Sequence, residues 1–153
     1  MILANKAALA FFLAFLNSHA QTLDGNLRSA GFTEVHAAVW NGDADKVRRL
    51  IKGGANVNVA SDFGTTPLHS AAMKGSVEVI KTLLELGAAL EARDTLGRTP
   101  LFIAAEVNPQ PTKVIEELLS AGASIESKDK FGKTARDACW TAEACRLLGG
   151  NSK

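Results

Sequence analysis

Two histidines at equivalent places in a repeated sequence could form part of a metal site. His36 and His69 lie 33 residues apart, and the next two equivalent positions hold Phe102 and Asp137. A zinc site normally needs three or four ligands. Because the series supplies two imidazoles and then stops, we predict a structural role for both histidines and no metal ion.

The only cysteines, Cys139 and Cys145, have a spacing that allows two outcomes. Six residues of continuous helix rise about 9 Å, whereas Cα atoms more than about 7 Å apart cannot be bridged. A disulfide therefore requires a break in the helix near Trp140 and Thr141. With that break, the disulfide would fix the short C-terminal cap. Redox catalysis is not predicted, because the chain has no Cys-x-x-Cys.

Motifs for catalysis are absent from the sequence. The chain has no Gly-rich phosphate loop, no Gly-x-Ser-x-Gly and no His-Glu-x-x-His. Its Asp and Glu residues are spread singly, as they are on solvated helix faces. We therefore predict a protein that is not an enzyme and that binds no cofactor.

A repeat with a period in the low thirties must position these residues. Thr66-Pro67-Leu68-His69 returns 33 residues later as Thr99-Pro100-Leu101-Phe102, and Gly87-Ala88 returns after 35 residues as Gly122-Ala123. Such a period indicates stacked units, none of which can bury its apolar side alone. A stack of this kind presents a binding surface rather than a deep pocket.

Each unit has the same order of parts. A turn ends in a glycine, which permits the positive φ of a tight turn. A Thr-Pro pair then starts a short, alanine-rich helix, because proline suits the first helical position. A second helix has one apolar stripe, and a brief extended arm at 57–59, 90–92 or 125–127 follows it. The stripes are Val47/Leu50/Ile51, Ile80/Leu83/Leu84 and Ile115/Leu118/Leu119.

This order of turn, Thr-Pro-Leu-His, Ala-Ala, helix break, Leu-Leu and Gly-Ala resembles the ankyrin repeat over residues 32–149. The resemblance implies an all-α ankyrin-repeat solenoid of about four helix-turn-helix units with β-turn arms. It also implies that His36 and His69 hydrogen-bond the turn and neighbouring backbone. The predicted segments are a linker at 21–31, units at 31–63, 64–96 and 97–131, a cap at 132–149, and a tail at 150–153.

The third and last units depart from the repeat pattern. Val107–Pro111 contains two extra residues, and its two prolines exclude helix, so we expect a longer loop there. The last unit lacks about four residues between its helices, judged by its repeat alignment. Its first helix, 134–140, is therefore expected to run nearly straight into the second. Since about three repeats are the minimum for a stack, this cap should matter for stability.

The resemblance implies a concave side, lined by turn tips and short helices, that contacts another protein. Phe63, Leu96 and Phe131 recur at one turn position and form an apolar row flanked by charge. Such a row suits an interface, but it also suits side chains that fold back and seal the stack. The predicted partner-binding residues are Trp40, Asn41, Asp62, Phe63, Thr65, Met73, Lys74, Thr95, Leu96, Arg98, Glu106, Val107, Lys130, Phe131 and Lys133.

The first 20 residues have the order of a secretory signal peptide. Lys6 precedes an apolar run from Ala7 to Leu16, and Asn17-Ser18-His19-Ala20 follows. The run is about half the roughly 17–25 residues that a membrane anchor needs. We expect cleavage near Ala20, no stable membrane insertion, and export to the periplasm or the exterior.

The net charge of the chain that remains after signal cleavage bears on its partner. Removing Lys6 from the 17 basic residues leaves 16, against 16 acidic ones, so a nucleic-acid partner is not indicated. We expect a monomer that binds another protein. By resemblance the chain looks like a bacterial periplasmic protein, and its neutral, apolar-rimmed face favours a helper of an envelope enzyme. An inhibitor or immunity protein against a toxin or hydrolase, or a secreted effector, is the alternative.

Overall fold

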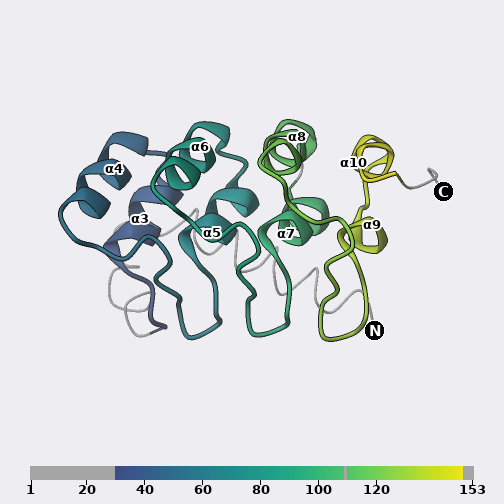
Figure 1. The fold of residues 1–153 in the computed structure, drawn as a ribbon, viewed down its shortest axis with the longest axis horizontal. Helices are drawn as coiled ribbons and strands as arrows, with labels where there is room; N and C mark the ends of the chain where they lie inside the picture. Colours follow the sequence, from purple (N-terminus) through teal and green to yellow (C-terminus); the bar gives the residue numbers. More distant parts are fainter. Residues whose placement is uncertain (1–29, 109, 150–153) are drawn as a thin grey trace.

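The computed structural model describes residues 30–108 and 110–149. This part of the chain contains eight α-helices and no strand, which confirms the predicted all-α solenoid. The helices pair in chain order, and the pairs stack in a single row (Figure 1). The predicted signal peptide, most of the 21–31 linker and the 150–153 tail lie outside the described residues.

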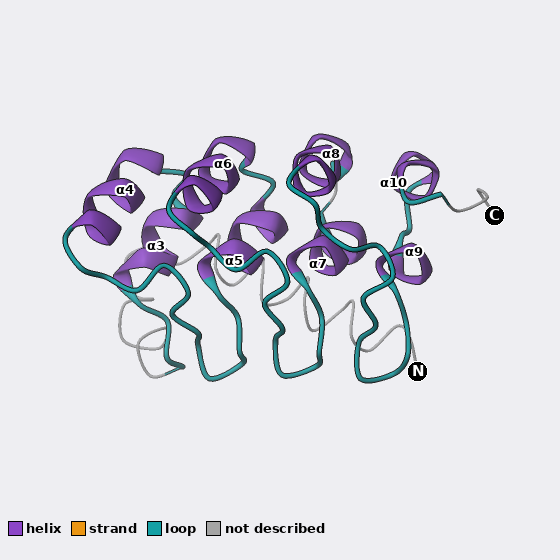
Figure 2. Ribbon diagram, viewed as in Figure 1, coloured by secondary structure: helices purple, strands orange, loops and turns teal. Residues whose placement is uncertain are grey.

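The helix pairs form two layers, with the long loops between pairs on the far side of the first layer (Figure 2). The first helices stack on one another, and so do the second helices. The first layer contains α3 (Glu34–Trp40), α5 (Pro67–Lys74), α7 (Pro100–Val107) and α9 (Ala135–Ala138). The second layer contains α4 (Ala44–Lys52), α6 (Val77–Glu85), α8 (Thr112–Ser120) and α10 (Ala142–Leu147).

Local sequence signals set the ends of the first helices. Thr66 and Thr99 are the N-caps of α5 and α7, and each is followed by a proline at the first helical position, as predicted. Gly75 ends α5 in the left-handed conformation, with φ 86°. These short helices therefore begin and end where the repeat pattern places them.

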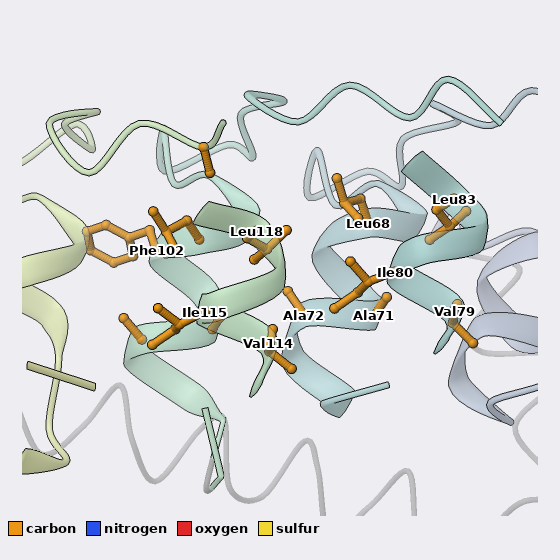
Figure 3. Packing of buried hydrophobic residues seen from close by; sticks show 14 of the residues in the cluster. Leu68, Ala71, Ala72, Val79, Ile80, Leu83, Phe102, Val114, Ile115 and Leu118 are labelled. Carbon is orange, nitrogen blue, oxygen red and sulfur yellow. The ribbon is translucent and has the colours of Figure 1, made fainter. Parts of the chain in front are cut away.

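Alanines on the first helices allow the two layers to approach closely. Ala71 and Ala72 on α5 are fully buried. Figure 3 shows Ile80 from α6 and Val114 from α8 beside these small residues, with Leu83 and Leu118 farther along the same helices. A fully buried Leu or Ile side chain contributes about 1.5–3 kcal/mol. The core is therefore one continuous strip along the stack, which no single unit could form alone.

The segments that follow the second helices are turns, so the predicted extended arms at 57–59, 90–92 and 125–127 are wrong. Residues 57–58, 90–91 and 125–126 lie in turns. The Val59 N–H donates to the Asn56 carbonyl over 3.2 Å, and the Ala92 N–H donates to the Ala89 carbonyl over 3.2 Å. The alternating apolar residues reflect this turn, which packs Val57 against the core.

A longer loop separates α7 from α8, as the prolines of the Val107–Pro111 insertion predict. Helix α7 ends at Val107 and α8 begins at Thr112. Asn108 is buried, and its side-chain amide donates to the Ala72 carbonyl over 3.2 Å. This contact attaches the inserted loop to the preceding unit.

The helical part of the cap is interrupted, although the repeat alignment predicted one nearly continuous helix. Helix α9 has only four residues, and Cys139 and Thr141 have extended backbones with ψ 136° and 140°. The predicted first helix at 134–140 is therefore too long, and it does not run straight into the second. The break brings the Cα atoms of Cys139 and Cys145 to 5.3 Å, and the two residues form a disulfide. The disulfide joins α9 to α10 in the unit that lacks about four residues of the repeat.

Candidate protein-binding surface

Within residues 61–132, three turn tips project from the first helix layer, at residues 61–64, 94–97 and 129–132. In each tip, a side-chain oxygen of the first residue accepts backbone N–H groups across the turn. Asp129 Oδ1 accepts from Phe131 N–H at 2.9 Å and from Lys133 N–H at 2.8 Å. Asp94 and Ser61 make the equivalent bonds in the other two tips. The first residue of each tip therefore has a structural role, which the sequence analysis missed although its Ser/Asp recurrence was visible.

Backbone hydrogen bonds join neighbouring tips to each other. The Thr95 N–H donates to the Phe63 carbonyl, and the Lys130 N–H donates to the Leu96 carbonyl, each over 2.9 Å. Gly64 has φ 70°, and a Cβ there would lie 2.8 Å from the Thr95 nitrogen. Glycine is therefore required both for the turn and for the close approach. The three tips form one continuous edge with fixed spacing.

The apolar residue of each tip differs in its exposure. Phe63 is 53% exposed and Phe131 is 73% exposed, whereas Leu96 is half-buried. The Phe131 ring therefore does not fold back to seal the stack, whereas Phe63 and Leu96 are partly covered by it. Trp140, which is also 53% exposed, lies in the break of the cap and outside this row.

Both histidines bridge one unit to the next through the backbone, as the resemblance implied. Nδ1 of His69 accepts the Thr66 N–H at 3.2 Å, and its Nε2 lies 2.9 Å from the Arg98 carbonyl. His36 makes the same two contacts, with Thr33 and with the Thr65 carbonyl. An Nδ1 that accepts a hydrogen bond leaves the proton on Nε2, so both rings are neutral here. Burial lowers the pKa of each imidazole, and the hydrogen bond to the carbonyl offsets this only in part.

Arg98 and Glu106, two of the predicted partner-binding residues, are bound to each other within the chain. Arg98 Nη1 lies 2.8 Å from Glu106 Oε2, and Arg98 Nη2 lies 2.7 Å from Asp94 Oδ2. The Asp94 side chain is only 3% exposed and that of Arg98 is 16% exposed. These ion pairs therefore hold the middle tip against the end of α7, and they leave little of the Arg98 side chain exposed to a partner.

The remaining predicted partner-binding residues lie on the tips or near the ends of the first helices. The Arg98–Glu106 pair shows that the last turn of α7 adjoins the tip row, and Lys74 Nζ lies 5.5 Å from the centre of the Trp40 ring. We call the tips and the C-terminal ends of α3, α5 and α7 the inner surface. Besides Phe63 and Phe131, its exposed members among the predicted residues are Asn41, Asp62, Lys74, Thr95, Lys130 and Lys133, and besides Leu96, Arg98 and Glu106, its half-buried ones are Trp40, Thr65, Met73 and Val107.

Away from the tips, the surface offers little for chemistry. An open groove of about 570 Å³ has Asn108, Lys113 and Glu143 among its lining residues, which include neither histidine nor cysteine. Across residues 30–108 and 110–149, no group of three or more His, Cys, Asp or Glu residues could hold a metal ion. No helix in those ranges is both long and apolar enough to cross a membrane.

Comparison with known proteins agrees with this architecture. Residues 35–129 match the family described as "Ankyrin repeats (3 copies)", which is more than half of the 153 residues. The chain belongs to the ankyrin-repeat family. No curated protein matches it. Ankyrin repeats are generally protein–protein interaction modules and are typically non-enzymatic.

Proposed function

We propose that this protein is a non-enzymatic interaction module that binds one partner protein through its inner surface. The observation that carries the proposal is the exposure of Phe63 and Phe131 on a row of tips joined by backbone hydrogen bonds. Aromatic rings are enriched where proteins meet. Because the tips are already ordered, little conformational entropy is lost when a partner binds to them.

The cellular setting extends this proposal. We place the protein in the periplasm or outside the cell, after cleavage near Ala20. The Cys139–Cys145 disulfide supports this placement, because disulfides persist in oxidising compartments. In that setting the favoured role is a helper that holds an envelope enzyme in its working form.

A second role is an inhibitor or immunity protein against a toxin or hydrolase. Exposed lysines beside Phe131 favour it, because a charged face steers association with an oppositely charged target. A secreted effector would act outside the cell. Cell fractionation separates the helper from the effector, since a helper of an envelope enzyme remains with the envelope and an effector is found in the medium.

The test is affinity capture of tagged residues 21–153 from the extract of the cells that make the protein. The inner-surface variant is Phe63→Ser/Leu96→Ser/Phe131→Ser. Its matched control is Trp140→Ser, which removes an exposed ring outside the row. We expect one dominant protein to be retained by the wild type and the control and lost from the triple variant. Equal retention by all three folded baits, or no retained protein, would contradict the proposal.

A further inference from the structure

We propose that the last tip of the row binds an acidic segment of the partner protein that carries an aromatic or aliphatic residue. The inference rests on the proposed function and names the chemistry of its partner. We call Phe131 with Lys128, Lys130 and Lys133 the cationic tip. All four side chains are exposed, and Phe131 is the most exposed large apolar residue among residues 30–108 and 110–149.

The carboxylate closest in sequence to the cationic tip is already occupied. Asp129 Oδ1 accepts the N–H groups of Phe131 and Lys133, which close the turn. The backbone of Lys128 is also held, because Arg93 Nη1 donates to its carbonyl over 2.6 Å. The tip is therefore a fixed platform. Asp129 keeps its negative charge while it accepts these N–H groups, and the three lysines against this one carboxylate leave the tip with a net positive charge.

The three lysines are not neutralised by ion pairs within the described part of the chain. The ion pairs there involve other lysines and arginines. The Asp137 carboxylate also interacts with Lys133, which makes a minor contribution to lowering the pKa of Asp137. The main cause of that lowering is hydrogen bonding from Thr134, so the Asp137 carboxylate is committed to the cap of α9. The positive charge of the tip remains available to a partner.

Charge changes sign along the row of tips. The second residue of each tip is Asp62, then Thr95, then Lys130. The residue after each tip glycine is Thr65, then Arg98, then Lys133, and Arg98 is neutralised by Asp94 and Glu106. An extended partner segment would therefore be oriented, with its carboxylates toward Lys130 and away from Asp62.

A protein segment fits this row better than nucleic acid or a membrane does. A nucleic acid strand needs positive charge along its whole track, but here the first tip presents Asp62 and the middle one an already paired arginine. An anionic membrane also needs a broad basic surface, whereas the lysines are confined to one tip. A polypeptide can supply an apolar side chain for Phe131 and carboxylates for the lysines beside it.

The test is selection from a phage-displayed library of random 12-residue peptides, followed by fluorescence anisotropy with the enriched peptides. The tip variant is Lys130→Glu/Lys133→Glu. Its matched control is Lys52→Glu/Lys113→Glu, which changes the net charge equally at exposed lysines on the second helices. All proteins are first compared by thermal melting, so that loss of fold is not mistaken for loss of binding.

We expect the wild type to enrich peptides that combine Asp or Glu with Phe, Trp or Leu. The tip variant should bind them about tenfold more weakly, because two attractive surface charges become repulsive. The control should bind like the wild type, and the difference should shrink at high salt. Phe131→Ser should also weaken binding.

Four results would overturn the inference. Enriched peptides without acidic residues, or peptides that bind the tip variant normally, would place binding elsewhere on the inner surface and leave the proposed function standing. No enrichment would also reject the acidic segment, while the capture experiment separately decides the proposed function. Lysine-dependent binding to phosphatidylglycerol vesicles or to a 20-nucleotide single-stranded DNA, without peptide binding, would assign the cationic tip to lipid or nucleic acid.

Discussion

The backbone N–H of Lys130 donates to the carbonyl oxygen of Leu96 over 2.9 Å, and this bond fixes the last turn tip against the one before it. The equivalent bond from Thr95 to Phe63 joins the first two tips. These bonds involve only backbone atoms, so the row should survive changes of side chains such as Phe63 and Phe131, which take no part in them. Binding and stability should therefore be separable at this surface.

Substitution of the tip residues should test that separation. Phe63→Ser and Phe131→Ser should each change the free energy of unfolding by less than about 0.5 kcal/mol, because the rings are mostly exposed. Leu96→Ser should cost more, about 1 kcal/mol, because Leu96 is half-buried. Urea unfolding followed by circular dichroism measures all three. A larger loss at either phenylalanine would mean that the rings seal the stack.

Reduction of the Cys139–Cys145 disulfide should loosen the cap. A bridge that closes so short a loop is expected to contribute about 2 kcal/mol. The urea midpoint of the wild type should therefore fall when a dithiol reductant is added. The Cys139→Ser/Cys145→Ser variant should show the lower midpoint with or without reductant. Identical midpoints for both proteins in both conditions would show that the bridge does not stabilise the cap.

Loss of the buried Asn108 side chain should destabilise the inserted loop. Its amide donates to the Ala72 carbonyl, and its Oδ1 accepts the Gln110 N–H at 2.9 Å. Asn108→Ala should cost about 1–3 kcal/mol, because it leaves buried polar groups unpaired. The control is Asn56→Ala, which removes one exposed local bond to the Asn58 N–H. Equal losses in thermal or urea unfolding would refute a special role for the buried amide.

Stability should fall as the pH drops through the range where histidine titrates. His36 and His69 have pKa values lowered by burial, so they stay neutral in the fold after the unfolded chain begins to protonate near pH 6.5. The unfolded state then binds more protons, so the free energy of unfolding is greatest above about pH 6.5 and declines below it. Protonation would also place a hydrogen on Nδ1, which accepts the threonine N–H.

The control for this pH dependence is His36→Gln/His69→Gln, because glutamine suits the same place in a capping box but does not titrate. Melting temperatures between about pH 7.5 and about pH 5.5 should fall more steeply for the wild type than for this variant. Parallel curves would assign the loss to other groups. Asp137 acts at lower pH, since its pKa is depressed and its contribution is lost only as acid protonates the carboxylate.

Features that depend on a few neighbouring residues could be predicted from the sequence. The Thr-Pro starts of α5 and α7 and the proline-containing loop after Val107 follow from local backbone chemistry. The extended arm at 57–59 was wrong, because alternation over three residues cannot distinguish a strand from a turn that buries its first residue.

Features that depend on contacts between units were less accessible. The ion pairs of Arg98 with Asp94 and Glu106 depend on how the middle tip packs against α7, which the sequence pattern does not give. The sequence does not decide the exposure of Phe63 and Phe131, because it depends on how neighbouring tips pack. The break at Cys139 contradicts the continuous helix that the repeat alignment predicted, and it meets the condition that the cysteine spacing set for a disulfide.

Site-specific photo-crosslinking in the producing cell tests the central claim most directly. A photoreactive phenylalanine analogue would replace Thr95, which is exposed in the middle tip, or Glu116, which is exposed on α8 in the second helix layer. If the inner surface binds the partner, the probe at Thr95 should form one crosslinked product and the probe at Glu116 should form none. Crosslinking only from Glu116 would contradict binding through the turn tips.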